Sequence, residues 1–221
     1  MKVIAHIETC FTSKFGIPRQ AGLANTPGRI IFEPEYRVAE AVRGLEGFDY
    51  IWLIWNMDKA VRDTWSPTVR PPRLGGNRRI GVFATRSPFR PNAIGLSSVQ
   101  LTGIEHTQEY GTVLHVRGAD LMDGTPIYDI KPYLPYTDSH PNARSGFAPS
   151  AAEQLLEVDC SPMLLNKIPA DMQQGLIDIL SHDPRPQYQQ DSQRIYGLDY
   201  GKHEVHFRVD ESRVIVIDIT D

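Results

Sequence analysis

Short apolar runs, rich in β-branched and aromatic residues, dominate the first two thirds of the chain. Glycine, proline and aspartate interrupt them at close intervals, as is typical of strands joined by tight turns. The runs that we expect to form strands are residues 3–7, 50–55, 80–84, 93–104, 112–118 and 126–130. This succession predicts a mainly β fold with a closed or nearly closed sheet. No G-x-G-x-x-G motif opens a helix after a strand, so a Rossmann nucleotide site and a parallel α/β sheet are not expected.

One helix is expected inside this β region. It would begin at Pro34, since proline is favoured in a first helical turn, and Gly44 and Gly47 would end it. Apolar residues at spacings of three and four would give it one apolar face, made by Val38, Ala41, Val42 and Leu45.

The composition changes around residues 136–150, where polar and turn-forming residues replace the periodic pattern. We expect a linker there. It would divide the chain into a domain of residues 1–145 and a smaller α+β module of residues 146–221.

Within the C-terminal module, a helix is expected to start near Pro169. Its apolar face would be made by Met172, Leu176 and Leu180. Residues 203–209 and 213–219 alternate in hydrophobicity and are expected to form a hairpin.

Arginine is concentrated in one segment of a chain that is otherwise mildly acidic. Residues 62–90 contain seven arginines and one aspartate, a local formal charge of +6, whereas the 221-residue chain carries −4. A planar guanidinium can bind two phosphate oxygens at once, so the segment predicts a localised site for a phosphate-bearing partner, nucleic acid first. The alternative is that these arginines pair with acids elsewhere in the chain.

Within this segment, Arg86 and Arg90 lie on a loop that two prolines stiffen. Pro88 and Pro91 fix their own φ angles and push Ser87 and Arg90 toward extended conformations. We therefore expect a preformed, non-helical connection that holds a ligand. The alternative is a pair of arginines that only cap a turn and pair with surface acids.

Three further polar segments each allow two interpretations. Asp120 and Asp123 could receive amines or hydroxyls of a ligand, although Asp123-Gly124 is a common hairpin signal and the spacing favours a turn. Residues 128–133 combine an acid, a base and two tyrosines, which a surface ion pair would explain equally well. The glycine-containing loop of residues 15–22 could offer N–H groups to a ligand or only connect two elements.

Several classes of protein are disfavoured. Cys10 and Cys160 lie far apart and fit neither zinc-ligand spacing nor a disulfide framework, and the seven histidines show no metal-site pattern. No G-x-S-x-G motif is present. The N-terminus lacks the apolar run of a signal peptide, and no segment reaches the roughly 20 apolar residues that span a bilayer. We therefore expect a soluble, cytoplasmic protein without a metal.

Four motifs, in this order, resemble the TsaA-like family. They are Pro18-Arg19-Gln20, residues 47–55, residues 81–96 with the core Ala-Thr-Arg-Ser-Pro-Phe-Arg-Pro-Asn, and residues 120–133. The resemblance covers residues 1–145. Residues 183–188, Asp-Pro-Arg-Pro-Gln-Tyr, resemble the additional module of the longer bacterial members.

The resemblance implies an S-adenosylmethionine-dependent methyltransferase with an N-terminal β-barrel in place of a Rossmann sheet, followed by the small C-terminal α+β module. The enzyme would work as a homodimer. Its substrate would be threonine tRNA that already carries threonylcarbamoyladenosine beside the anticodon, and it would methylate N6 of that adenosine. Two other functions stay open: methylation of a different RNA or small molecule, and non-catalytic binding of nucleotides or RNA.

Carried over residue by residue, the resemblance implies contacts with the methyl donor from Pro18, Arg19, Gln20, Asp58, Lys59, Arg86, Leu96, Asp120, Leu121, Met122 and Asp123. At Asp58-Lys59 the chain departs from the histidine-containing pair that many relatives have. Backbone contacts are therefore expected there rather than side-chain contacts.

Methyl transfer from a sulfonium requires alignment of the reacting atoms and no covalent residue. A base near the acceptor nitrogen should help, and we expect Asp129 or Asp123 to assist while Lys131 or Tyr133 orients the modified base. Contacts with RNA are expected from Arg78, Arg79, Arg90, Arg185 and Tyr188, the last by stacking on an unpaired base. For the C-terminal motif, a purely structural role is the alternative.

Overall fold

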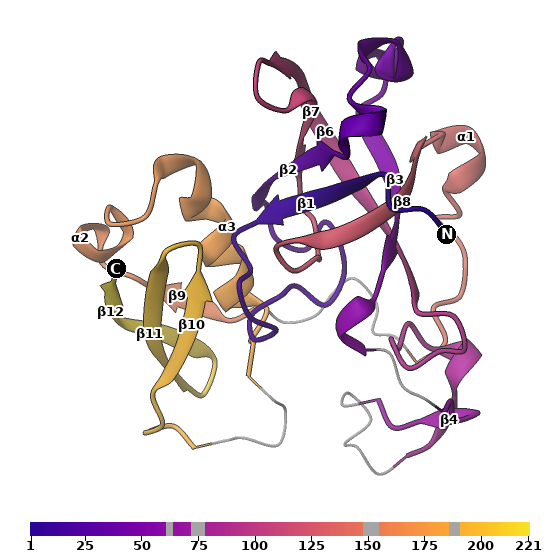
Figure 1. Cartoon of the computed structure of the whole chain (residues 1–221). Helices are drawn as coiled ribbons and strands as arrows, with labels where there is room; N and C mark the ends of the chain where they lie inside the picture. Colours follow the sequence, from indigo (N-terminus) through magenta and orange to yellow (C-terminus); the bar gives the residue numbers. More distant parts are fainter. Residues whose placement is uncertain (61–63, 72–77, 148–154, 186–190) are drawn as a thin grey trace.

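The computed structural model describes residues 1–60, 64–71, 78–147, 155–185 and 191–221. Six strands close into an N-terminal barrel, and a four-stranded sheet with its helices forms the C-terminal part (Figure 1). The predicted fold class, a mainly β chain with a barrel and a small α+β module, is confirmed.

The barrel strands are β1 (Ala5–Thr9), β2 (Pro27–Phe32), β3 (Tyr50–Asn56), β6 (Ile94–Thr107), β7 (Gly111–Arg117) and β8 (Thr125–Pro132). They join in the order β1-β2-β7-β6-β3-β8 and back to β1, and every neighbouring pair is antiparallel. Alternate residues point into the barrel, where the fully buried side chains include Ile7, Ile30, Leu53, Leu114 and Ile127. This alternation explains why most of these strands are predictable from the sequence.

One end of the barrel carries three of the connections that contain the motifs. Because neighbouring strands run in opposite directions, the last residues of β1, β3 and β7 lie beside the first residues of β2, β6 and β8. Connections 10–26, 57–93 and 118–124 therefore all leave the barrel at this end, which we call the loop end.

The prediction of a helix that begins at Pro34 is wrong. The segment instead forms three short 3₁₀ turns, η1 (Pro34–Tyr36), η2 (Ala39–Val42) and η3 (Leu45–Gly47). Val38 is extended, with φ −97° and ψ 120°, and Gly44 has φ +87°. Both residues take the backbone out of helical geometry between the turns, which the apolar spacing does not reveal.

One strand prediction also needs correction, and β2 is among the strands that the sequence did not indicate. The strand expected over residues 80–84 is short: β5 (Ile80–Gly81) pairs with β4 (Thr68–Val69), and the 3₁₀ turn η6 (Val82–Ala84) follows. Strand β2 was not expected, because Pro27 and Gly28 resemble turn residues. Proline is tolerated at the first residue of a strand. Glycine fits position 28 because a Cβ there would lie only 3.2 Å from the carbonyl oxygen of Glu8 on the neighbouring strand.

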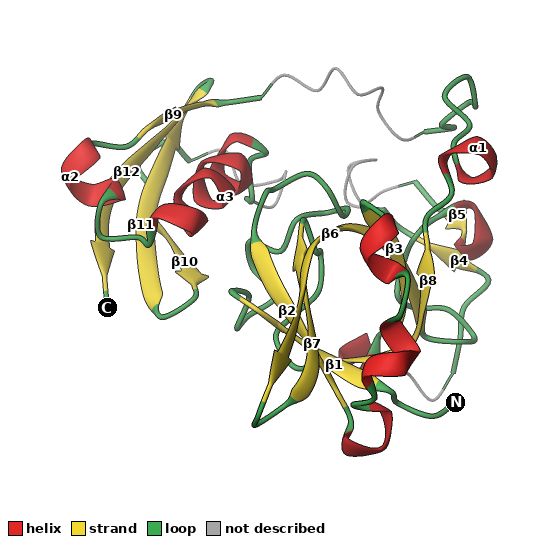
Figure 2. Cartoon of the chain, turned by 90° about the horizontal axis from the view of Figure 1, so that it is seen from above, coloured by secondary structure: helices red, strands yellow, loops and turns green. Residues whose placement is uncertain are grey.

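The C-terminal sheet has the strand order β10 (Tyr196–Tyr200), β11 (His203–Asp210), β12 (Arg213–Thr220), β9 (Glu157–Asp159). The expected hairpin is confirmed as β11 and β12, and the expected helix as α3 (Ala170–Ser181). Two shorter helices are α1 (Pro135–Asp138) and α2 (Pro162–Leu165). Helix α3 lies between the C-terminal sheet and the barrel (Figure 2).

The described helices include none with the length and apolar character needed to cross a membrane.

The two parts of the chain share one hydrophobic cluster. Connection 10–26 and the C-terminal part together supply its members, among them Cys10, Phe11, Ala24, Leu176 and Phe207. Hydrogen bonds also cross the boundary, from Gly201 N to Cys10 O and from Asn25 N to Asp178 Oδ2, both 2.8 Å long. Burial raises the pKa of the Cys10 thiol to about 12, so this thiol stays protonated within the interface.

The contact between α3 and the barrel depends on a glycine. A Cβ at Gly175 would lie 2.7 Å from Tyr200 Oη and 2.8 Å from Thr26 Cγ2. We expect Gly175→Ala to lower the free energy of unfolding by about 1–3 kcal/mol, although alanine is the better helix former. Urea unfolding measures the change, and Gly47→Ala, at an exposed glycine where a Cβ meets nothing within 4 Å, serves as the control. If Gly175→Ala were as stable as the original chain, α3 would not be held this closely against Thr26.

Candidate functional site

The structure brings the predicted donor-contacting residues to the loop end of the barrel. Connection 10–26 carries Pro18, Arg19 and Gln20. Connection 118–124 carries residues 120–123, which are Asp120, Leu121, Met122 and Asp123. Connection 57–93 supplies Asp58 and Lys59, in the 3₁₀ turn η4 (Asp58–Ala60), and Arg86. Leu96 is near the start of β6. Antiparallel closure thus gathers residues more than a hundred positions apart.

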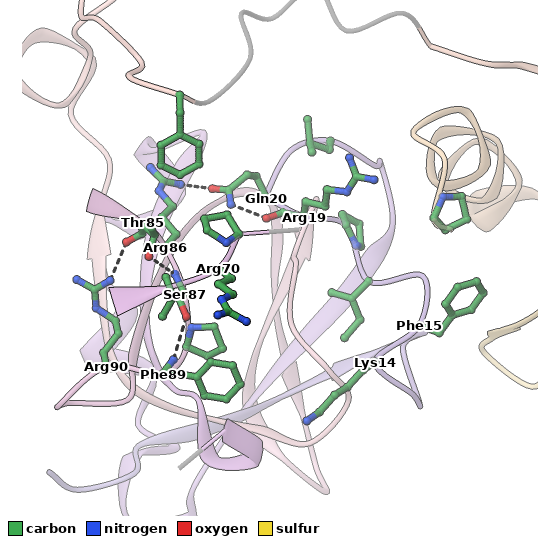
Figure 3. A pocket seen from close by; sticks show the side chains of 18 of the residues that line it. Lys14, Phe15, Arg19, Gln20, Arg70, Thr85, Arg86, Ser87, Phe89 and Arg90 are labelled. Carbon is green, nitrogen blue, oxygen red and sulfur yellow. Dashed lines mark hydrogen bonds between the residues drawn. The ribbon is translucent and has the colours of Figure 1, made fainter. Parts of the chain in front are cut away.

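A cavity of about 1100 Å³ lies between the loop end and the C-terminal part, and we call it the interdomain pocket. Connection 10–26 and connection 57–93 form two of its walls (Figure 3). The third wall comes from the end of α3 and the residues after it, Ile179, His182, Asp183, Pro184 and Arg185. This volume lies just above the usual range of ligand pockets in proteins, about 300–1,000 Å³.

The lining of the interdomain pocket is strongly basic. Its lysine and arginine residues are Lys14, Arg19, Arg70, Arg79, Arg86, Arg90 and Arg185. Among the described lining residues, Asp183 is the only acid. A low-dielectric hollow with this excess of positive charge favours an anionic ligand.

Arg86 and Gln20, both predicted to contact the donor, come from different walls and meet. The guanidinium of Arg86 donates a hydrogen bond to the side-chain oxygen of Gln20 (Figure 3). The side-chain nitrogen of Gln20 in turn donates to the carbonyl oxygen of Arg19. This chain of bonds fixes the relative position of connections 10–26 and 57–93.

The loop that contains Arg86 and Arg90 is preformed, as the prolines predict. Arg90 Nη1 donates to the carbonyl oxygens of Thr85 (2.7 Å) and Val82 (3.2 Å). The backbone N–H of Ser87 donates to Thr85 Oγ1 at 3.2 Å. Part of the hydrogen-bonding capacity of Arg90 therefore holds its own loop.

A chain of side-chain hydrogen bonds, which we call the relay, crosses the barrel wall and ends at Asp120. Trp55 Nε1 donates to Ser97 Oγ (3.0 Å), and Ser97 Oγ donates to Asp120 Oδ1 (2.6 Å). Ser97 is 3% exposed, so its hydroxyl is committed to this relay. Burial raises the pKa of Asp120, while the bond from Ser97, backbone amides and the charge of Arg86 offset part of the rise.

Trp55 and Ser97 were not predicted as site residues, and one sequence signal could have indicated them. Gly95 lies opposite Trp55 in the β3–β6 ladder, and a Cβ there would be 2.1 Å from the indole Cε2. The indole therefore lies across a glycine, which leaves its N–H directed at Ser97. The residues Gly95 and Ser97 belong to the Gly-Leu-Ser stretch that follows the proline-stiffened loop.

Asp123, Asp58 and Lys59 each already interact with another residue of the chain. Asp123 Oδ1 accepts a hydrogen bond from Thr9 N at 2.9 Å, and Gly124 has φ +74°, so this segment is also a turn that closes the barrel. Lys59 Nζ lies 3.0 Å from Asp58 Oδ2. The carbonyl oxygen of Lys59 accepts a bond from Lys14 Nζ at 3.1 Å.

Asp129, Lys131 and Tyr133, three of the residues predicted to assist catalysis, lie on the outer face of β8 and its end, away from the interdomain pocket of the same chain. Asp129 and Lys131 form an ion pair of 2.9 Å. Tyr133 packs beside Tyr50 and Trp52 near the start of β3, with ring centroids 6.2 and 5.6 Å away. Lys131 and Tyr133 are thus toward the end of the barrel opposite the loop end.

Asp129 nevertheless shares a row with one predicted donor contact. In the sheet, Ile54 of β3 stands opposite both Leu96 of β6 and Asp129 of β8. Directly opposed residues project from the same face, so Leu96, Ile54 and Asp129 form one cross-strand row on the outside of the barrel.

The predicted RNA-binding residues are distributed unevenly. Arg79 and Arg90 line the interdomain pocket, whereas Arg78 is exposed outside it. Arg185 lines the pocket but makes a two-pronged ion pair with Asp183, from Nε (2.8 Å) and Nη2 (2.9 Å). Tyr188 lies outside the described residues.

Arg185 therefore stiffens the C-terminal wall. Asp183 has the unusual φ of +50°, and its carbonyl oxygen accepts a hydrogen bond from Arg19 Nη2 at 3.1 Å. Bonding to Asp183 also raises the pKa of Arg185. The segment of Asp183 thereby connects the pocket's C-terminal wall to the predicted donor-contacting loop.

Both parts of the chain match families of known proteins. The sequence model for the tRNA-methyltransferase O N-terminal domain matches residues 6–139, and that for the TrmO C-terminal domain matches residues 146–221. A tRNA (adenine(37)-N6)-methyltransferase of Escherichia coli (strain K12) is 39% identical over 218 residues, covering 95% of this chain and 92% of the relative. A putative S-adenosylmethionine-dependent methyltransferase RcsF of Pseudomonas aeruginosa is 38% identical over 226 residues, covering 98% and 95%.

Solved structures agree with the sequence matches. A crystal structure of TrmO superposes with a TM-score of 0.80 at 32% identity, covering 100% of this chain and 99% of the other. TrmO from Pseudomonas aeruginosa superposes with a TM-score of 0.79 at 32% identity, with the same coverage.

The raised pKa of Asp120 predicts that replacing this residue by asparagine changes the stability of the fold in a pH-dependent way. An acid whose pKa is higher in the folded state than its ordinary 3.8 costs stability when it is charged, from the folded pKa upward. Asp120→Asn keeps an oxygen that accepts from Ser97 and removes the charge, so its stability relative to the original chain should be greatest near pH 7.

This relative stability of Asp120→Asn should decrease as the pH falls through the folded pKa of Asp120 toward 3.8. Urea unfolding at several pH values between about 4.5 and 8 follows it. Asp49→Asn, at a carboxyl outside this relay, is the control. A difference between Asp120→Asn and the original chain that is the same at every pH would contradict the assignment.

Proposed function

This chain belongs to the tRNA-methyltransferase O (TrmO) family, and on that premise we propose that it methylates N6 of threonylcarbamoyladenosine at position 37 of threonine tRNA. The enzyme is an S-adenosylmethionine-dependent tRNA (adenine(37)-N6)-methyltransferase, as its relatives are named. The single observation that carries the finer proposal is the interdomain pocket, where Pro18, Arg19, Gln20 and Arg86 meet a strongly basic lining.

The residues of this region fit S-adenosylmethionine, which supplies an electrophilic methyl group when bound. Ile17 and Pro18 offer apolar surface for the adenosine part, and Gln20 and Arg86 offer polar groups beside it. Arg86 suits the carboxylate of the donor, because a guanidinium binds two oxygens at once. Asp120, a carboxyl that interacts with the charge of Arg86 but does not line the pocket, is proposed to face the cationic part of the donor.

The work left to the chain is orientation and acceptance of a proton. The acceptor nitrogen N6 loses its proton when the new N–C bond forms, so a base near it should speed the reaction. We propose Asp129 for this role, with Lys131 and Tyr133 beside it orienting the base. Asp123 is the alternative, although its carboxylate already accepts a bond from Thr9 N.

We also propose that the enzyme is a homodimer and that Asp129 acts across the dimer interface. The outer face of β3 and β6 exposes apolar side chains; Leu96, for example, is 57% exposed, and Ile94 and Tyr50 are exposed too. A second copy packed on this face would cover them. It would also bring the Asp129 of one copy toward the loop end of the other.

The RNA would lie along the basic lining. Arg79 and Arg90 at the pocket and Arg78 outside it are proposed to contact phosphates. Arg185 contributes chiefly by stiffening the C-terminal wall, given its pairing with Asp183. A cytoplasmic location, where tRNA is available, goes with this function.

The proposed reaction is tested by transfer of labelled methyl from S-adenosylmethionine to threonine tRNA, with and without its threonylcarbamoyl group. Label on the modified tRNA alone supports the proposal. Label on unmodified tRNA instead would identify a different RNA acceptor. Donor binding without transfer to either tRNA would leave the non-catalytic alternative or another acceptor.

Arg86→Ala should lower single-turnover transfer by about 10–100-fold, since it removes a charged hydrogen bond worth about 1.5–3 kcal/mol. Arg43→Ala removes an exposed arginine that pairs with Glu40 near the opposite end of the barrel. It should transfer methyl at the original rate. Equal activity of both variants would remove Arg86 from the site.

The proposed sharing of the site between copies predicts complementation. Asp129→Ala and Arg86→Ala should each transfer methyl slowly when tested alone. Each mixed dimer, however, would contain one site with both residues intact. After subunit exchange at equal amounts, transfer should recover to about one quarter of the original. Light scattering checks the dimer directly, and Ile94→Glu should break it. A mixture no more active than its components would place both residues in one chain's site, or remove Asp129 from the mechanism.

A further inference from the structure

Two large aromatic rings stand exposed beside the interdomain pocket. Trp65, which lines the pocket, is 53% exposed, and Phe83 is 71% exposed. Their ring centroids are 6.2 Å apart and their planes differ by 31°. Exposed rings of this size forgo the burial that usually stabilises a phenylalanine or tryptophan, so their pairing here calls for a functional reason.

The fold holds the two rings in place. Strands β4 and β5 pair through Thr68 with Gly81 and Val69 with Ile80, and the ladder continues with a hydrogen bond from Val82 N to Pro67 O of 2.9 Å. Val82 is buried and anchors the turn η6. Its neighbour Phe83 is exposed to solvent. Trp65 lies on the other side of the ladder, in the segment before β4.

An arginine adjoins the exposed pair. The guanidinium carbon of Arg90 lies 5.6 Å from the centroid of the Phe83 ring, and Arg90 Nη1 is tied to the carbonyl oxygens of Thr85 and Val82. A guanidinium over a ring extends the flat, polarizable surface and adds positive charge to it. Trp65, Phe83 and Arg90 therefore form one continuous surface, which we call the aromatic platform.

The surroundings of the aromatic platform indicate what covers it. The pocket lining next to Trp65 carries Arg70, Arg79 and Arg86, and Asp183, the acid among the described lining residues, comes from the C-terminal wall. Flat aromatic surface combined with an arginine-rich groove is the arrangement by which proteins bind single-stranded nucleic acid. Phosphates would meet the arginines while a base lies on the rings.

We propose that the aromatic platform binds an unpaired nucleobase of the tRNA loop by stacking. The inference rests on the proposed function in one respect, that the macromolecular ligand is tRNA. It adds a contact site for a nucleotide other than the one that is methylated. Stacking on this platform requires no particular base, because every base has a flat face.

The test compares affinity for threonine tRNA with and without the ring surface. Phe83→Leu keeps an apolar side chain without a ring, Trp65→Ala removes the indole, and Trp65→Phe restores a ring. The first two should weaken tRNA binding by about 5–100-fold, and Trp65→Phe should stay within about threefold of the original chain. Tyr136→Ala, at an exposed aromatic residue on α1 that does not line the pocket, is the control and should bind normally.

The salt dependence distinguishes stacking from charge. The slope of log affinity against log salt should be unchanged in Trp65→Ala and Phe83→Leu, since no phosphate contact is lost, whereas Arg79→Ala should reduce it by about one. Quenching of tryptophan fluorescence by tRNA, reduced in Trp65→Phe, should accompany binding. Thermal melting of each variant checks that the fold is intact, and S-adenosylmethionine affinity checks that the donor site is unaffected.

Three results would overturn the inference. Unchanged tRNA affinity in both Trp65→Ala and Phe83→Leu would remove the platform from RNA binding. A change in oligomeric state in these variants would mean that a second copy covers the rings, and a loss of S-adenosylmethionine affinity alone would assign them to the donor. Failure of the proposed function is recognised separately, because the original chain would then transfer no methyl to threonylcarbamoylated tRNA.

Discussion

The packing of connection 10–26 against the C-terminal sheet is the contact on which the geometry of the site depends. This connection buries Phe11 in the shared hydrophobic cluster, and Phe15 and Ile17 pack against the same cluster. The next residues are Pro18 to Gln20, which belong to the pocket. Their position is therefore set by the interface between the two parts of the chain rather than by the barrel alone. A C-terminal module that only gripped RNA from a distance would not need such an interface.

Charge in this enzyme is separated in space, although the chain as a whole is mildly acidic. The basic side chains gather around one pocket, and the acids near them have specific partners. Asp183 binds Arg185 with both oxygens, and Asp120 accepts from Ser97 behind Arg86. Each acid thereby fixes a neighbouring group, and Asp183 offsets the charge of only one of the seven basic lining residues, Arg185. The pocket can therefore still attract a polyanion.

The sequence reveals those parts of the fold that depend on local pattern. Alternation along β3 and β7 identifies them as strands, and Pro88 and Pro91 identify a stiff loop. Two of the failures come where distant residues decide. Pro27 and Gly28 look like a turn until β1 and β7 pair on either side of them. The relay from Trp55 through Ser97 to Asp120 depends on the β3–β6 register and on connection 118–124 folding back, which no local spacing encodes. The pairing of Arg185 with Asp183 could have been anticipated, because the two residues are separated by one proline.

Methyl transfer gains most from a site that is rigid before the ligand arrives, because the chain contributes alignment rather than a covalent bond. The two connections that would hold donor and RNA are each immobilised by their own side chains. Arg90 holds the loop of residues 82–90 through two carbonyl oxygens, and Gln20 joins Arg86 to Arg19 across the pocket. An arginine already fixed by protein partners loses less side-chain entropy when a ligand binds. These hydrogen bonds use part of each guanidinium and therefore make its remaining donors more effective in recognition.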